Sequence, residues 1–190
     1  TAYVFDKPAV VEKIGEEREG ILFVGGFAHP PNEDAVLWFC EEILPFIRRQ
    51  LPDAPFRIVG SHVTEKVAAL GQQDGVEVLG FVSDEELHAL YQKSRIVAVP
   101  LRYGAGVKGK VIEALYYGAP VLTTPIGAEG IPDAAQVMEI REDAADFAAE
   151  TLRLYRDRDA LTAMAERAAR YIRAHNSMDA VWAELKDDFA

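Results

Sequence analysis

The chain has 190 residues, with 31 acidic against 20 basic side chains and a formal net charge of −11. This balance argues against a general affinity for nucleic acid or anionic lipid, because both attract excess positive charge. No apolar run approaches the ~20 residues that span a bilayer, and residues 1–10 lack the basic and apolar regions of a signal peptide. We therefore expect a cytoplasmic protein whose single cysteine, Cys40, is a buried thiol.

Short apolar, β-branched segments recur along the chain, each with the length of a buried strand. They are residues 21–25, 56–60, 76–80, 95–100, 120–124 and 137–140. Segments of helical period separate most of them. This alternation predicts an α/β domain with an open, Rossmann-like parallel sheet of about six strands and helices on both faces.

Several of the expected helices carry specific signals. Residues 32–51 place apolar side chains on one helical face, and Ser83 with Glu86 forms a capping box. Gly118 is a good stop for the helix expected over residues 108–117. After the last strand the pattern changes to amphipathic helices only, expected over residues 143–156, 158–175 and 177–189.

Residues 87–112 contain no acidic side chain, although the average for the chain predicts about four. Lys93 and Arg95 lie near the carboxyl end of a predicted helix, where cations are favoured in any case. The remaining cations follow a strand and open a helix, and they are Arg102, Lys108 and Lys110. A positive stretch at such a junction, in an acidic chain, predicts an anion site.

Glycines are interleaved with these cations. In open parallel sheets ligands bind beyond the carboxyl ends of the strands, and free N–H groups at a helix start attract phosphate. Glycine lets the backbone approach the ligand closely, and lysine adds charge. A turn that needed glycine only for its φ angles would not need lysine. We therefore expect a phosphate site built from Arg102, Gly104, Gly106, Val107, Lys108, Gly109 and Lys110.

The same glycines match the dinucleotide fingerprint, with Glu129 placed 20 residues beyond Gly109. We reject an NAD site for three reasons. The fingerprint belongs to the first strand, and here it follows the fourth. Several residues separate Val99 from Gly104, and Glu129 lies well past the next strand.

Glu113 lies on the helix that follows this loop. An acid near a phosphate site can accept hydrogen bonds from ribose hydroxyls. It can equally be a solvent-facing carboxylate paired with Lys108 or Lys110 at helical spacing. The residues alone leave these two interpretations even.

The run GAGVKGKVIEAL at residues 104–115, with the exit GAPV at residues 118–121, resembles the C-terminal domain of group 1 glycosyltransferases. These are family 4 retaining enzymes of GT-B fold, and the chain would be one half of that fold. The similarity extends to residues 21–25, 56–60 and 79–87, and it covers roughly residues 20–185 in the right order.

This resemblance implies roles for particular residues. Glu113 matches the second glutamate of the family's spaced pair, which grips the ribose of a nucleotide-sugar donor. The backbone of residues 106–109 matches the loop that cradles the diphosphate, and the turn at residues 79–82 matches the segment that contacts the base, which places Val82 at the donor. Lys108 is the catalytic candidate, stabilising charge on the leaving diphosphate. Neither a cofactor nor a metal held by Asp-x-Asp is implied.

The chain departs from the family pattern at two places. The first glutamate of the pair falls at Ala105, and the usual Arg and Lys after the first strand fall near Gly26 and Asn32. We infer that Lys108 or Lys110 takes over phosphate neutralisation. Lys108 is nearest the glycine turn, whereas Lys110 could point to solvent, because neighbouring helix residues diverge by about 100°.

The resemblance also implies an organisation and a set of partners. We expect a UDP- or GDP-sugar donor, no nucleic acid, and an acceptor (glycan, lipid or small molecule) held by an N-terminal domain outside this chain. The full-length protein would be cytoplasmic, with peripheral attachment at the inner membrane face left open. The expected parts are a lead-in at 1–19, the donor-binding core at 20–142 and C-terminal helices packing on the same domain at 143–190.

Two other classes of function stay open. One is a nucleotide-sugar epimerase of GT-B-like fold, which would need acid and base groups beyond those identified. The other is a non-catalytic nucleotide-binding domain whose acidic surface binds a partner. Binding of a nucleoside diphosphate without a response to NAD would favour the transferase.

Overall fold

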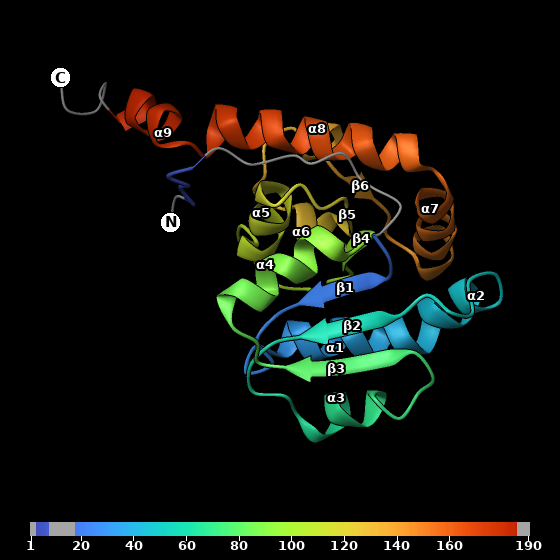
Figure 1. Ribbon diagram of the computed structural model, residues 1–190. Coiled ribbons are helices and arrows are strands. Elements are labelled where there is room, and N and C mark those ends of the chain that lie inside the picture. Colours follow the sequence, from blue (N-terminus) through green and yellow to red (C-terminus); the bar gives the residue numbers. More distant parts are fainter. Residues whose placement is uncertain (1–2, 8–17, 186–190) are drawn as a thin grey trace.

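The computed structural model describes residues 3–7 and 18–185. Its centre is a parallel sheet of six strands in the order β3-β2-β1-β4-β5-β6 (Figure 1). The strands are β1 (Ile21–Val24), β2 (Phe56–Val59), β3 (Val76–Gly80), β4 (Ile96–Val99), β5 (Val121–Thr123) and β6 (Glu139–Ile140). Each strand lies within the segment predicted for it, so the expected open parallel sheet is confirmed.

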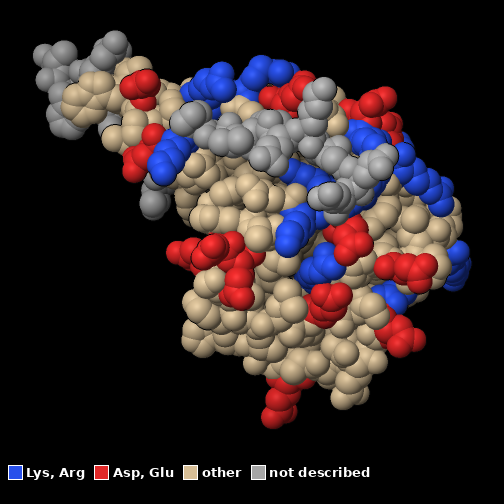
Figure 2. All heavy atoms as spheres, in the orientation of Figure 1, with Lys and Arg blue, Asp and Glu red and all other residues tan. Residues whose placement is uncertain are grey.

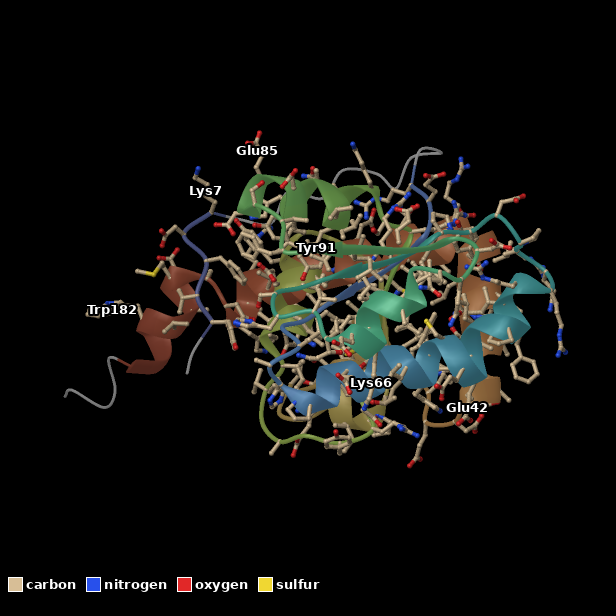
Figure 3. The ribbon with its side chains drawn as sticks, turned by 90° about the horizontal axis from the view of Figure 1, so that it is seen from below. Lys7, Glu42, Lys66, Glu85, Tyr91 and Trp182 are labelled. Atoms are coloured by element: carbon tan, nitrogen blue, oxygen red, sulfur yellow. The ribbon has the colours of Figure 1, made fainter. Side chains whose placement is uncertain are left out.

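Helices cover both faces of this sheet, and α1 and α4 lie on opposite sides of it (Figure 3). The helical elements are α1 (Pro30–Trp38), a π-helical turn η1 (Phe39–Ile43), α2 (Leu44–Arg48), α3 (Glu65–Leu70), α4 (Asp84–Lys93), α5 (Gly109–Tyr116), α6 (Pro125–Ala128), a 3-10 turn η2 (Ala134–Gln136), α7 (Ala144–Arg156), α8 (Arg158–His175) and α9 (Met178–Leu185). Within the described residues, no helix is both long enough and apolar enough to cross a membrane.

The burial of each strand follows from its place in the sheet. The central strand β4 has the sequence Ile-Val-Ala-Val, and all four side chains are buried, because helices cover both of its faces. The edge strand β3 alternates instead, with Val76 buried and Glu77 exposed. The capping box of α4 is present as predicted, with Ser83 accepting from the Glu86 backbone and Glu86 accepting from the Ser83 backbone.

The helix predicted over residues 32–51 differs from the observed structure. It begins at Pro30, and a π-helical turn separates α1 from α2. The physical reason is Pro45, which has no backbone N–H and whose ring would clash with the carbonyl four residues earlier in a regular helix. The wider turn absorbs this misfit, and the amide of Leu44 donates to the Phe39 carbonyl. Two short helices, α3 and α6, were not predicted.

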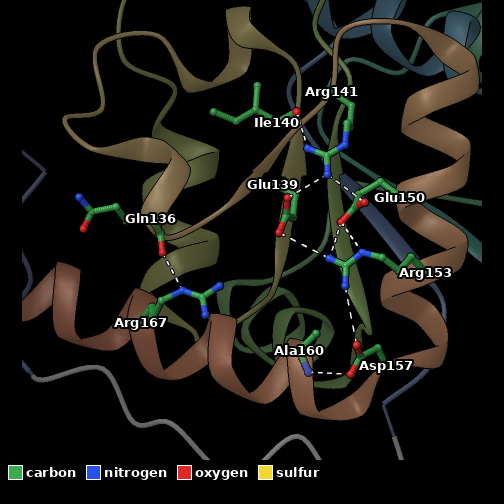
Figure 4. Close-up of polar contacts among 9 residues, drawn as sticks. All are labelled: Gln136, Glu139, Ile140, Arg141, Glu150, Arg153, Asp157, Ala160 and Arg167. Carbon is green, nitrogen blue, oxygen red and sulfur yellow. Dashed lines mark hydrogen bonds and ion pairs between the residues drawn. The ribbon is translucent and has the colours of Figure 1, made fainter.

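Ion pairs join helix α7 to the edge of the sheet at β6. Arg141 next to β6 pairs with Glu139 at 3.2 Å and with Glu150 of α7 at 2.9 Å (Figure 4). Arg153, one turn further along α7, also pairs with both carboxylates. Beyond α7, helix α8 packs on α5. Lys and Arg over α8 are interleaved with Asp and Glu, a mixture typical of a solvated helix face (Figure 2).

Candidate functional site

The order of the strands reverses between β1 and β4, which are neighbours in the sheet. At such a switch point the two following connections leave toward opposite faces, and a crevice opens at the carboxyl edge of the sheet. The connection after β1 leads to α1, and the connection after β4 carries the glycine-lysine loop to α5. The topology therefore places the predicted phosphate loop where open α/β sheets bind ligands.

Lys110 bridges these two connections. Its ammonium donates a hydrogen bond to Asn32 Oδ1 on α1 and lies 4.6 Å from the centre of the Phe23 ring on β1. Gly25 makes room for it, since a Cβ atom there would come within 2.5 Å of Lys110 Nζ. The prediction that Lys110 could point to solvent is wrong, because the first turn of α5 faces the connection after β1.

The electrostatic state of Lys110 is unusual. Burial first, and repulsion from Lys108 second, lower its pKa to about 7. Among residues 3–7 and 18–185 no carboxylate forms an ion pair with it. A half-buried ammonium that is held by an amide oxygen and a ring, without a carboxylate partner among the described residues, would be stabilised by binding an anion.

Lys108 has a different environment. It is the N-cap residue of α5, and its side chain is 11% exposed. The ammonium folds back to donate to the Gly106 carbonyl and lies 3.3 Å from Glu129 Oε2. Part of its charge is therefore already balanced within the loop, in contrast to that of Lys110.

The glycine turn needs glycine for its backbone. Gly104 has φ 126° and Gly106 has φ 78°, and residues that carry a Cβ atom rarely adopt such backbone conformations. Between this turn and α5, Val107 is 41% exposed. Gly109 begins α5, so the free amides of its first turn follow the glycines directly.

Arg102 is a predicted site residue whose charge is already paired with a carboxylate in the structure. Its guanidinium makes two hydrogen bonds to the carboxylate of Asp34 on α1 and lies 5.6 Å from the centre of the Trp38 ring. This pairing raises the pKa of Arg102 and uses its charge. Arg102 thus joins the two connections but offers less charge to an anion than Lys110.

Glu113 lies one turn beyond Lys110 on α5. The hydroxyl of Tyr91 on α4 donates to Glu113 Oε2 at 3.1 Å, and burial raises the pKa of the carboxyl group. In the described part of the chain Glu113 forms no ion pair with Lys108 or Lys110, so the paired-surface interpretation is wrong. Val82 follows β3 and lines a groove with Leu79, Phe81, Glu86, Ala89, Leu90 and Lys93.

Two neighbours of the site were missed by sequence reasoning. Tyr91 lies within the acid-free stretch, where only the cations were considered as site residues. Tyr3 gave no signal, yet its hydroxyl would lie 2.5 Å from a Cβ built on Gly109. Phe5 anchors this segment by stacking on Tyr116 with ring centres 3.8 Å apart.

Three comparisons place this geometry among known proteins. A family described as "Glycosyl transferases group 1" matches residues 18–157. A Klebsiella pneumoniae protein described as "Uncharacterized 44.6 kDa protein in cps region" is 30% identical over 129 residues, which are 65% of this chain and 33% of that protein.

Solved structures agree in fold. S. aureus TarM, crystallised with Fondaparinux, alpha-GlcNAc-glycerol and UDP, has a TM-score of 0.76 at 18% identity, covering 97% of this chain and 38% of TarM. Anabaena HepE, crystallised with UDP and glucose, has a TM-score of 0.69 at 13% identity, covering 91% of this chain and 48% of HepE.

This chain spans only about a third of the length of the Klebsiella protein and of TarM. Its sheet is consistent with the Rossmann-like C-terminal domain of the GT-B fold. The match over residues 18–157 covers well over half of the chain, and the chain therefore belongs to the group 1 glycosyltransferases.

Proposed function

We propose that the switch point holds the diphosphate of a nucleotide-sugar donor, with Lys110 as the principal cation and Lys108 as the second. The observation that carries the proposal is the Lys110 ammonium, half-buried between the connections after β1 and β4 without a carboxylate partner among the described residues. A donor diphosphate would supply the missing negative charge. Gly104, Gly106, Val107 and Gly109 would supply close backbone approach and helix-start amides.

Further support comes from relatives of the same fold, since TarM and HepE were crystallised with UDP. By analogy Glu113 binds the ribose and Val82 lies near the base. The donor-binding core would span residues 20–142, with residues 143–190 supporting it. Arg102 would mainly orient the loop through Asp34.

The reaction assigned to the full-length protein is transfer of a hexosyl group from a UDP- or GDP-sugar with retained configuration. The bond between the anomeric carbon and the diphosphate oxygen breaks, and the oxygen keeps the electron pair. The two lysines and the amides of α5 stabilise that charge. The oxygen of an acceptor hydroxyl forms the new bond to the anomeric carbon and loses its proton, so the products are the glycosylated acceptor, the nucleoside diphosphate and one proton.

The acceptor would be bound by an N-terminal domain outside residues 1–190, so this chain alone would bind donor without transferring sugar. We assign the full-length enzyme to the cytoplasm, with peripheral attachment at the inner membrane face as its possible route to a lipid or glycan acceptor.

The test is calorimetric titration of wild type, Lys110→Met and Lys108→Met with UDP, GDP and ADP. We expect Lys110→Met to weaken the best ligand about tenfold or more, a loss of at least ~1.4 kcal/mol. Lys108→Met should cost less, because Glu129 already balances part of its charge. Lys66→Met is the matched control, since Lys66 is an exposed lysine with its own carboxylate partner, Glu33. Unchanged affinity in both test variants would refute the site.

A further inference from the structure

Tyr91 lies on the inner side of α4 with no exposed surface. Figure 3 shows it pointing into the body, whereas Glu85 of the same helix points out. The ring stacks on Tyr117 with centres 5.4 Å apart and planes 12° from parallel. Packing therefore fixes the ring, and its hydroxyl has one observed partner, Glu113 Oε2 at 3.1 Å.

We propose that Tyr91 is a positioning residue of the donor site, whose hydroxyl holds the Glu113 carboxylate so that its second oxygen faces the ribose of the donor. This inference rests on the proposed function, because it takes the ligand of Glu113 to be a ribose. It adds a residue from α4, a helix outside the glycine-lysine loop, to the donor-binding machinery.

The physical basis is preorganisation. A glutamate side chain has several rotatable bonds, and fixing it on binding costs affinity. A hydrogen bond from a packed phenol fixes it in advance. Only Oε2 is used by Tyr91, so the carboxylate keeps acceptor capacity for a sugar hydroxyl.

The same bond favours the charged form of Glu113. Burial raises the pKa of Glu113, and the hydrogen bond from Tyr91 is the leading influence that lowers it. From α4, His88 lowers and Asp84 raises this pKa by their charge. Burial and the charge of Glu113 raise the pKa of Tyr91 well above its ordinary value, so the phenol remains a donor.

Tyr117, the residue that follows the last turn of α5, offers a matched control. Its ring lies against Tyr91, but its hydroxyl is hydrogen-bonded to His88 Nε2 instead of Glu113. Tyr91→Phe and Tyr117→Phe each remove one phenol oxygen from the same stacked pair. Only the first removes the donor to the carboxylate.

The experiment measures affinity for three ligands between pH 5 and 8. They are the best-binding diphosphate among UDP, GDP and ADP, its 2′,3′-dideoxy analogue, and inorganic pyrophosphate. We expect Tyr91→Phe to weaken the ribonucleotide about fivefold and to leave the analogue and pyrophosphate unchanged. The ratio of wild-type affinity for the ribonucleotide to that for its dideoxy analogue should fall as Glu113 is protonated, because the charge that Lys110 gains in the same pH range acts on both ligands. In Tyr91→Phe this fall should begin at higher pH. Tyr117→Phe should behave as wild type.

The outcomes separate the two claims. If Glu113→Ala weakens the ribonucleotide selectively but Tyr91→Phe does not, the donor site stands and the role of Tyr91 is overturned. Equal loss of pyrophosphate and ribonucleotide in Tyr91→Phe would also overturn it, since that is the signature of a structural defect. If wild type binds none of the diphosphates, the proposed function fails and the role of Tyr91 fails with it.

Discussion

The cluster at β6 and α7 and the switch point between β1 and β4 both concentrate charge, but in opposite ways. At β6, Arg141 and Arg153 share the carboxylates of Glu139 and Glu150, so each charge faces its opposite (Figure 4). At the switch point, Lys110 is buried against an amide oxygen and an aromatic ring. A balanced cluster stabilises the fold, whereas an unbalanced, half-buried cation costs stability, and we propose that a bound anion offsets this cost.

The largest effect should come from breaking the balanced cluster. Glu150 is 7% exposed and contacts both arginines. We expect Glu150→Ala to lower the free energy of unfolding by about 2–3 kcal/mol, somewhat less than for a fully buried pair because both arginines reach solvent. Urea unfolding measures this loss. Affinity for a nucleoside diphosphate should not change, and a change would mean that the cluster and the site are coupled.

Replacing the cation at the switch point should stabilise the chain instead of destabilising it. We expect Lys110→Met to raise the free energy of unfolding of the ligand-free chain by about 1–2 kcal/mol at pH 7, because a methionine side chain avoids the cost of burying charge. The lost hydrogen bond to Asn32 offsets part of the gain. Destabilisation in the same urea experiment would show that Lys110 is a structural residue.

The difference in unfolding free energy between Lys110→Met and wild type should depend on pH between about 7 and 10.4. The pKa of Lys110 is about 7 in the folded chain and about 10.4 in an unfolded chain. Between these values the unfolded state binds more protons, so the lysine costs nothing above about pH 10.4 and its cost grows as pH falls toward 7. The advantage of Lys110→Met should therefore shrink as pH rises from 7 to 10. Parallel stability curves for the two proteins would contradict the lowered pKa.

The smallest effect on stability is expected from replacing Arg102. This residue lies beside the candidate site, but its charge is paired with a carboxylate, as in the cluster at β6 and α7. Its side chain is 47% exposed, and its guanidinium is paired with Asp34. We expect Arg102→Met to lower stability by no more than about 1 kcal/mol. Diphosphate affinity should fall by less than in Lys110→Met. If Arg102→Met proved the more damaging to binding, the roles of the two cations would have to be exchanged.

Local sequence patterns predicted most of the fold. Apolar runs located the strands, because strands buried on both faces leave a continuous apolar signal, and the capping box located α4. The glycine-lysine loop was placed correctly at a strand-to-helix junction. The π-helical turn was missed, since an apolar face continues through it and Pro45 was not weighed as a helix breaker.

The details of the site depended on contacts between distant parts of the chain. Lys110 meets Asn32, and Glu113 meets Tyr91, through the packing of α5 against the connection after β1 and against α4. The sequence predicted that Lys108 and Lys110 point in different directions, but not that Lys110 reaches α1 and Lys108 folds back on the loop. That depends on the orientation of α5 in the sheet, which no local pattern encodes.

The contact between Lys110 and Asn32 bears on how relatives of this chain should be aligned. Resemblance to the family places its usual lysine near Asn32, on the first turn of α1, and here an ammonium reaches that same point from α5. In a sequence alignment read one column at a time, position 32 would show the loss of the family's lysine, and position 110 would show the gain of a lysine with no evident connection to it. From their contact in three dimensions we infer that the two changes are a single compensated exchange, and among homologues the two columns should covary.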